Sequence, residues 1–246
     1  MRSFEINEKT LIVLPHLDDE FALAPLIRNL KKKDKKNLTF IFCAERINSP
    51  KKRILKRRKE NKLAMKYLGI RSNQIIYLND FFLVEDLSLY KSKENIIKFL
   101  KSKKFNFIIT LACEGGNPDH DYLAVLIYKL SKEKNFKPYY FPAYNYENFL
   151  FFPYKIIDAL SSERNFYKEI IIGYFCWIDS IVIALIYNSE FFTFIKMIPH
   201  LIHKLITCNS ILYTDKINFE RINWNKSLVN RIYRFDYQII QNEFYK

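Results

Sequence analysis

Two short segments of the chain carry side chains that can hold a metal ion and move a proton. The first, PHLDDE, contains His16, Asp18 and Asp19, and the second, EGGNPDH, ends in Asp119 and His120. His16 and Asp19 stand on a turn that enters a helix, so both can face one cation. With His120 they would give three protein ligands and one open position, which is the pattern of a catalytic zinc site.

The acids beside these ligands have chemistry of their own. Asp18 is not needed as a ligand, and we expect it to act as the general base toward water. Asp119 is expected to hydrogen-bond a ligand or a reacting group without touching the metal. Gly115 and Gly116 allow the second loop to approach other backbone closely. The alternative for DDE is a helix N-cap with first-turn acids, which needs no metal.

The elements that must position both segments alternate between strand and helix patterns. Short apolar runs predict strands at 10–14, 38–44, 74–78, 105–111 and 138–142. Helical periodicity predicts helices at 20–30, 51–68, 93–103 and 122–132. This alternation predicts an α/β, Rossmann-like fold with a mostly parallel sheet flanked by helices. Such sheets bind ligands at the carboxyl ends of strands where the strand order reverses, so the two segments can meet at one site.

The second half of the chain has a different pattern. Nine of the sixteen residues from 139 to 154 are aromatic, and helical patterns from 161 to 207 precede a polar, aromatic tail. The apolar run 170–187 is short for a membrane span and contains Asp179, so we expect a buried helix there. No Gly-, Pro- or Ser-rich linker separates the halves.

We therefore expect one domain over residues 1–246. Its core covers about 10–142, and a helical and aromatic C-terminal extension covers about 143–246. The cysteines, which have no paired spacing, are expected to be buried, reduced thiols, and the N-terminus MRSFEINEKT lacks a hydrophobic signal core. Both features predict a cytoplasmic protein with no transmembrane span. His200 and His203 are expected to be ordinary helix residues rather than a second metal site.

The basic charge of the chain is concentrated. Among 246 residues, 40 Lys and Arg against 26 Asp and Glu give a net charge of +14. Residues 31–66 alone hold 15 basic and 3 acidic residues, a local charge of +12. The abundance of Lys, Ile and Asn is also typical of A/T-rich codons, and helix 51–66 lacks a recognised nucleic-acid motif. We expect a solvated face or an anionic partner, and no specific nucleic acid.

The two segments also resemble a known family. PHLDDE and GGNPDH are similar, in this order and context, to the motifs AHPDDE and GGHPDH of the PIG-L/LmbE-like zinc deacetylases. The family's RxxExxxAxxxLG helix is matched by Arg57, Glu60, Ala64, Leu68 and Gly69. The resemblance covers roughly residues 10–125.

The resemblance implies a function. By position it implies that His16, Asp19 and His120 bind Zn²⁺ or another divalent transition metal. It also implies that Asp18 is the general base and that Arg57 contacts the substrate. The implied reaction is hydrolysis of the acetamide of an N-acetylglucosamine-type conjugate, which releases acetate and a free amine. The basic patch favours a small-molecule conjugate with an anionic group.

Two positions depart from the family motifs. Leu17 replaces a Pro, and Asn117 replaces the first His of HPDH, which in the family acts as general acid or oxyanion stabiliser. Asn cannot deliver a proton at neutral pH, although its amide can hydrogen-bond an oxyanion. Loss of a general acid costs about 10²–10⁴ in rate. Either Asp121, Glu114 or a Tyr of the aromatic segment replaces the His, or the protein is a degenerate member that binds metal or sugar without turnover.

Overall fold

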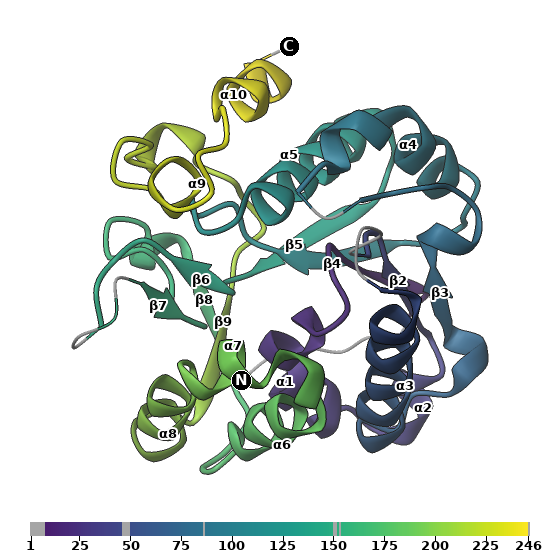
Figure 1. Ribbon diagram of the computed structural model, residues 1–246, viewed down its shortest axis with the longest axis vertical. Helices are drawn as coiled ribbons and strands as arrows, with labels where there is room; N and C mark the ends of the chain where they lie inside the picture. The colour runs from purple at the N-terminus through teal and green to yellow at the C-terminus, as the bar shows by residue number, and fades with distance from the viewer. Residues whose placement is uncertain (1–7, 46–49, 86, 150–151, 153, 246) are drawn as a thin grey trace. The chain divides into compact units, whose positions relative to one another are not determined.

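A parallel sheet forms the centre of the fold in the computed structural model, which describes residues 8–45, 50–85, 87–149, 152 and 154–245 (Figure 1). Its five strands lie in the order β3-β2-β1-β4-β5. Their bounds are β1 (Thr10–Leu14), β2 (Leu38–Phe42), β3 (Ile75–Tyr77), β4 (Phe107–Leu111) and β5 (Lys137–Phe141). The pairs β1–β2, β2–β3 and β4–β5 are parallel. The predicted α/β class is therefore confirmed.

The chain divides into two compact units. Unit 1 comprises Met1–Asp86 and Glu169–Ile211, and unit 2 comprises Leu87–Lys168 and Leu212–Lys246. The paired strands β8 (Lys168–Ile171) and β9 (Ser210–Tyr213) contain the residues at which the chain passes between the units. The expectation of a single domain over residues 1–246 stays a prediction.

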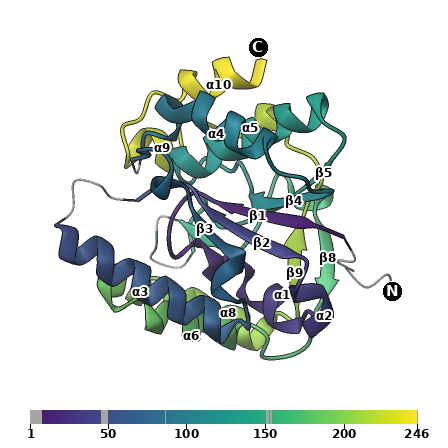
Figure 2. The same ribbon diagram turned by 90° about the vertical axis from the view of Figure 1, so that its right-hand side faces the viewer.

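Unit 1 carries β1 to β3 and a layer of helices. Figure 2 shows α3, α6 and α8 on one side of β1 and β2. All five residues of β1 are buried, as a continuous apolar strand in a parallel sheet requires. The helical elements of unit 1 include η1 (Asp19–Leu23), α1 (Ala24–Asn29), α2 (Lys32–Lys35), α3 (Lys51–Tyr67), η2 (Ser72–Gln74), η3 (Leu78–Asp80), α6 (Ile178–Ile186), η6 (Asn188–Glu190), α7 (Phe191–Ile195) and α8 (Ile198–Thr207).

Unit 2 is built around β4, β5 and helix α5 (Pro118–Glu133). The C-terminal helix α10 (Gln238–Tyr245) packs on α5. Tyr140 of β5 and Thr214 exchange backbone hydrogen bonds of 2.8 and 2.9 Å, so residues after β9 extend this edge. The other elements include η4 (Leu89–Ser92), α4 (Lys93–Lys101), β6 (Tyr144–Asn145), β7 (Lys155–Ile156), η5 (Arg164–Phe166), η7 (Phe219–Arg221) and α9 (Leu228–Arg231).

Several expected elements differ from the structure. The helix expected at 122–132 begins at Pro118, because Asn117 caps it and Pro is favoured in the first turn. The helix expected at 20–30 begins as the 3₁₀ helix η1. The buried helix expected at 170–187 is wrong, because β8 runs to Ile171 and α6 covers only Ile178–Ile186. The helical pattern expected from 161 to 207 fails at the same strand.

Other expectations concern the cysteines, the histidines and the membrane. Cys43, Cys113 and Cys176 are buried free thiols, and Cys208 is half-buried. Among the described residues, no single helix has the length and apolar character to cross a membrane. The helices Ile178–Ile186 and Asn188–Ile195 have the required length and apolar character only when they are counted as one segment, and that segment is bent by 84°. His200 is buried and His203 is exposed, so the two side chains do not lie together on one face of α8.

Candidate active site

The first segment turns sharply after β1. The backbone N–H of His16 donates to Asp19 Oδ2 at 2.8 Å, and His16 Nδ1 lies 3.3 Å from the same oxygen. Asp18, between them, has a φ of 122°, which non-glycine residues rarely adopt. The turn therefore brings two of the predicted ligands into contact, and strain in the backbone is concentrated at the predicted base.

Helix α3 holds this turn through Arg57. Its Nη2 donates to the carbonyl of Leu17 at 2.8 Å and lies 3.2 Å from Asp18 Oδ1. Its Nε lies 3.6 Å from Glu190 Oε1. Burial raises the pKa of Asp18 to about 8, and the positive charge of Arg57 is the largest opposing effect. Arg57 is 6% exposed, so it acts inside unit 1 on the turn. Its contact with substrate stays a prediction.

The other motif residues of α3 are also internal. Glu60 accepts hydrogen bonds from the backbone N–H of Ser189, at 3.0 Å, and from its hydroxyl. Asn61 donates to Glu20 at 3.2 Å, and Tyr187 donates to the same carboxylate oxygen at 2.6 Å. Glu60 of the helix motif therefore ties the segment after α6 to α3, and its neighbour Asn61 ties η1 to α3, which holds η1 in place after the turn.

The second segment forms a tight loop between β4 and α5. Asp121 Oδ1 accepts the N–H groups of Glu114, at 2.8 Å, and Gly115, at 3.1 Å. A Cβ on Gly116 would lie 1.8 Å from the carbonyl oxygen of Tyr144, so only glycine fits there. A side chain in the first turn of α5 thus stabilises the loop that precedes the helix, and Asp121 Oδ1 is occupied in doing so.

Asn117 is the N-cap of α5. Its Oδ1 accepts the N–H of Asp119 at 2.8 Å, and its Nδ2 donates to Tyr233 Oη at 3.4 Å. Asn is among the best N-cap residues. The residue that replaces the His of the family motif therefore stabilises the start of α5, and both polar atoms of its side chain are hydrogen-bonded.

Asp119 supports a neighbouring loop. Its two carboxylate oxygens accept the backbone N–H groups of Leu87, at 2.5 Å, and Leu89, at 3.2 Å. Leu87 has a φ of 62°. Since the carboxylate holds backbone groups, the contacts described for Asp119 are those of a positioning residue.

His120 lies one turn into α5 and is 3% exposed. Its Nε2 lies 3.3 Å from Tyr144 Oη, and which of the two donates depends on the tautomer. The ring centroids are 4.8 Å apart. A hydroxyl from the aromatic segment therefore stands beside the third predicted metal ligand.

Unit 2 contains two buried glutamates, Glu114 of the second segment and Glu163. Tyr167 Oη donates to Glu114 Oε1 at 3.1 Å. Within the described residues, Glu114 Oε2 and Glu163 Oε1 have no hydrogen-bond partner. Burial, with the negative charge of Glu163, raises the pKa of Glu114 well above its usual value. Burial also raises the pKa of Glu163 to about 7, against the charge of Arg221.

Glu163→Gln is expected to stabilise the protein at pH 8 and not at pH 4.5. The pKa of Glu163 rises from 4.5 to about 7 on folding, so between these values the folded state keeps a proton that the unfolded state has lost. The wild-type free energy of unfolding therefore falls as pH rises through this window. In Glu163→Gln the free energy of unfolding should not show this fall, so at pH 8 the variant should be more stable than the wild type by on the order of 2 kcal/mol. Urea unfolding at both pH values measures it.

The control for this prediction is Glu220→Gln, which changes an exposed acid of the same unit. It should leave the difference in stability between pH 4.5 and pH 8 as in the wild type. If Glu163→Gln also leaves that difference unchanged, the glutamate is ionised in the folded protein without cost, and the prediction is wrong.

The C-terminal segment supports this loop, and no sequence pattern indicates that support. The carbonyl of Gly115 accepts the N–H of Leu228 at 2.9 Å. A Cβ on Gly115 would lie 2.9 Å from Ser227 Cβ and 3.0 Å from Ile222 Cγ2. Together with Tyr233, which bonds Asn117, these residues brace the second segment. The contacts use backbone groups and small side chains, which leave no motif to detect.

The family comparison covers the residues that carry this site. Residues 11–131 match the family described as PIG-L: GlcNAc-PI de-N-acetylase. Both motif segments and helix α3 lie inside this range. This part of the chain therefore matches the PIG-L family, the family predicted from the motifs. A search of curated proteins finds no match to the chain.

Solved structures agree on the fold. The chain is 14% identical to a triple mutant of a deacetylase from the teicoplanin biosynthetic pathway, with 83% of this chain and 96% of that chain covered and a TM-score of 0.53. It is 13% identical to the A40926 pseudoaglycone deacetylase Dbv21, with 84% and 96% covered and a TM-score of 0.51. For an N,N'-diacetylchitobiose deacetylase from Pyrococcus horikoshii the identity is 18%, the coverage is 51% of this chain and 52% of that chain, and the TM-score is 0.39.

Proposed function

We propose that the protein is a metal-dependent hydrolase that removes the acetyl group from an N-acetylated amino sugar of the N-acetylglucosamine type. His16, Asp19 and His120 are its ligands for Zn²⁺ or another divalent transition metal. The contact between His16 and Asp19, in a family segment described as a de-N-acetylase, is the observation that carries the proposal.

The donor set fits such a metal. Two imidazoles and one carboxylate are nitrogen and oxygen ligands that zinc prefers, and three protein ligands leave a position for chemistry. His16, Asp19 and His120 are, among the described residues, a set of side chains that could hold a metal ion.

The chain's own groups account for the proton transfers. A bound metal ion would polarise the acetyl carbonyl and favour ionisation of water. Asp18 takes the proton of the water that attacks the carbonyl carbon. The bond between that carbon and the nitrogen then breaks, and Asp18 gives the proton it took to the leaving nitrogen, so acetate and a free amino sugar form. Arg57 holds the turn that carries Asp18.

We assign to Tyr144 the hydrogen bond to the developing oxyanion that the motif His would give. Its Oη lies beside His120, whereas Asn117 is occupied in capping α5. The other candidates are less suited, because Asp121 accepts two backbone N–H groups and Glu114 is bonded to Tyr167. Loss of one such donor typically costs about 10²–10³ in rate.

The second candidate function is binding of metal or sugar without turnover. It is favoured by Asn117, whose engaged side chain replaces the acid of the family motif. Asn117→His tests this directly. If the missing acid limits the reaction, the variant releases acetate faster than the wild type. If Tyr144 has taken over the role, the rate does not rise.

The deciding experiment measures metal content and acetate release on one preparation. The substrates are N-acetylglucosamine and its nucleotide and phosphatidylinositol conjugates. We expect about one equivalent of divalent metal and acetate release with at least one substrate. His120→Ala should lose the metal, and His203→Ala, which changes an exposed histidine, should keep it. Tyr144→Phe should keep the metal and lower kcat about 10²-fold.

The outcomes separate the two functions. A wild-type protein that binds no divalent metal overturns the hydrolase, and of the second candidate it leaves only binding of sugar. A protein that binds one equivalent but releases no acetate from any of these substrates supports binding without turnover. If Tyr144→Phe and the wild type have equal kcat, Tyr144 does not hydrogen-bond the oxyanion, and Glu114 becomes the candidate for that role.

A further inference from the structure

Unit 1 exposes many large apolar side chains in one segment. Ten large apolar residues between 169 and 211 are exposed, and they lie on β8, on the loop before α6, and on α6, α7 and α8. Phe192 is 80% exposed, Tyr174 78% and Ile206 70%. Single exposed apolar residues are ordinary, but a gathering of this kind marks a surface that meets another apolar phase.

The exposed residues follow the period of the helices. On α6, Ile178 and Leu185 are exposed and stand seven residues apart, whereas Ile183 and Ala184 are buried. Each helix of this kind therefore has two apolar sides, one for the core and one for the surroundings. On α8, Ile202 and Ile206 stand four residues apart and are exposed as well.

The loop before α6 stands clear of the protein. A Cβ on Gly173 would meet nothing within 4 Å. Tyr174 and Phe175 follow it, and Phe175 is 64% exposed with a φ of 61°. An aromatic residue rarely takes this backbone conformation, so the loop presents two adjacent rings at an energetic cost.

The neighbouring helix α3 is basic and also exposes two leucines, Leu55 and Leu63. Figure 2 shows it in one layer with α6 and α8, and α3 contacts α6. Lys59, Lys62 and Lys66 line a groove of about 740 Å³, whose apolar lining includes Ile70 and Ile75. Within the described residues none of these three lysines takes part in an ion pair, so their charge is available to an anionic partner.

The acids near this layer are already neutralised. Asp179 accepts the hydroxyl of Tyr67 at 2.6 Å and lies 3.5 Å from Arg28 Nε. Glu190 pairs with Arg53 at 3.2 Å. These two acids therefore do not offset the positive charge of Lys59, Lys62 and Lys66. A partner that matches this surface must combine negative charge with an apolar interior.

We propose that the helix layer formed by α3, α6, α7 and α8 docks on an anionic lipid bilayer. The exposed apolar side chains enter the boundary between headgroups and acyl chains, and the lysines of α3 contact lipid phosphates. This is the arrangement by which amphipathic surfaces lie on membranes without crossing them. A nucleic acid would match the lysines, but it would leave the exposed isoleucines and leucines in water.

Vesicle co-sedimentation of the full chain tests the proposal without reference to catalysis. The vesicles are phosphatidylcholine alone or phosphatidylcholine with about 30% phosphatidylglycerol, at low and at physiological salt. We expect binding to the anionic vesicles that weakens as salt rises, and at least about tenfold weaker binding to the neutral ones.

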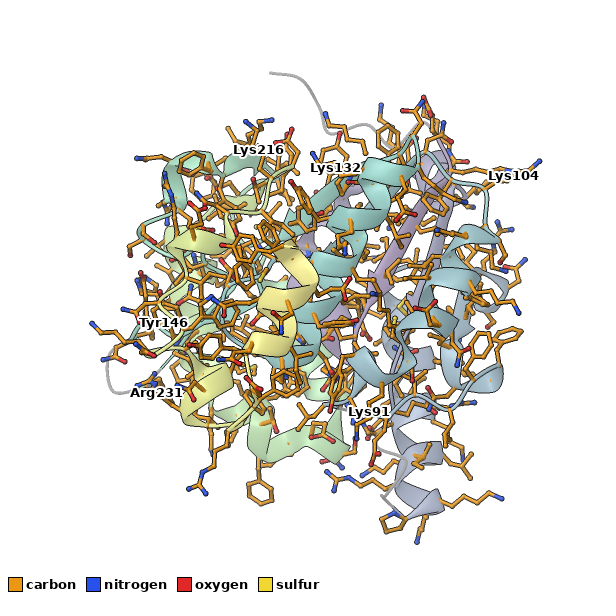
Figure 3. All side chains as sticks on the ribbon, turned by 90° about the horizontal axis from the view of Figure 1, so that it is seen from above. Lys91, Lys104, Lys132, Tyr146, Lys216 and Arg231 are labelled. Atoms are coloured by element: carbon orange, nitrogen blue, oxygen red, sulfur yellow. The ribbon has the colours of Figure 1, made fainter. Side chains whose placement is uncertain are left out.

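Two triple variants separate the charge from the apolar contacts. Lys59→Gln with Lys62→Gln and Lys66→Gln should weaken binding to anionic vesicles roughly 100-fold, at about fivefold for each lysine. The control removes the same charge from unit 2 through Lys104→Gln, Lys132→Gln and Lys216→Gln, three exposed lysines labelled in Figure 3. This control should bind vesicles within about twofold of the wild type.

The apolar variant is Tyr174→Ser with Phe175→Ser and Phe192→Ser. All three side chains are exposed, so the change should preserve folding, which circular dichroism checks. It should weaken binding to both kinds of vesicle at least about tenfold. Absence of binding to anionic vesicles at low salt overturns the proposal. So does a wild-type dimer that the apolar variant converts to a monomer with unchanged vesicle binding, because the surface then meets a second copy of the chain.

Discussion

Asp18→Asn is expected to lower the rate of acetate release by a factor of about 10²–10⁴, with the metal content and the fold unchanged. Asn has the same shape as Asp but cannot accept a proton. It also tolerates the φ of 122° at this position better than other residues do. The contacts of Arg57 with Leu17 and Glu190 remain in the variant, so the turn keeps its support. Acetate release and metal analysis on the same preparation measure the effect.

The control for Asp18 is Asp158→Asn. Asp158 also pairs with an arginine, Arg164, at 2.9 Å, but it lies away from both motif segments in the sequence. It should change neither rate nor metal content. Loss of metal from Asp18→Asn would make Asp18 a ligand rather than a base. A rate within about threefold of the wild type would assign the proton transfer to another group.

The sequence predicts the buried strands and the long helices of the fold best. The strand expected at 10–14 is β1, and the helix expected at 51–68 is α3 to within one residue. Strands covered on both sides read as continuous apolar runs, and α3 ends before Gly69, whose φ is 80°. The motif residues also fall where expected, after β1 and after β4, because short polar motifs at strand ends are tied to those strands.

The C-terminal half is harder for a physical reason. Residues 170–187 are apolar on all sides, and such a run predicts burial. In the structure, Ile178 and Leu185 are exposed on one side of α6 while Ile183 is buried on the other. Periodicity within one chain cannot distinguish an apolar residue that meets the core from one that meets another phase. The same limit applies to Asn117, where the sequence shows a missing acid and the structure shows a helix cap.

Gly116→Ala is expected to destabilise the protein by about 3 kcal/mol or more and to remove metal binding with it. The new Cβ would lie 1.8 Å from the carbonyl oxygen of Tyr144 and 2.8 Å from its carbonyl carbon. Those atoms belong to backbone, which cannot move aside as the end of a flexible side chain can. The loop must shift, and the loop carries the cap of α5 and precedes His120 directly. Urea unfolding and metal analysis measure the two effects.

Gly173→Ala is the matched control, because it adds the same methyl group in open space. Its φ of 124° makes any side chain strained, but nothing lies within 4 Å of the new Cβ. It should cost on the order of 1 kcal/mol through the backbone alone and leave the metal bound. Gly116 has no positive φ, so the strain at Gly173 acts against the control, and a larger loss of stability in Gly116→Ala is due to the contact with the Tyr144 backbone. Equal stability of the two variants would mean that β6 yields to the methyl group, and the second loop would then be adaptable rather than fixed.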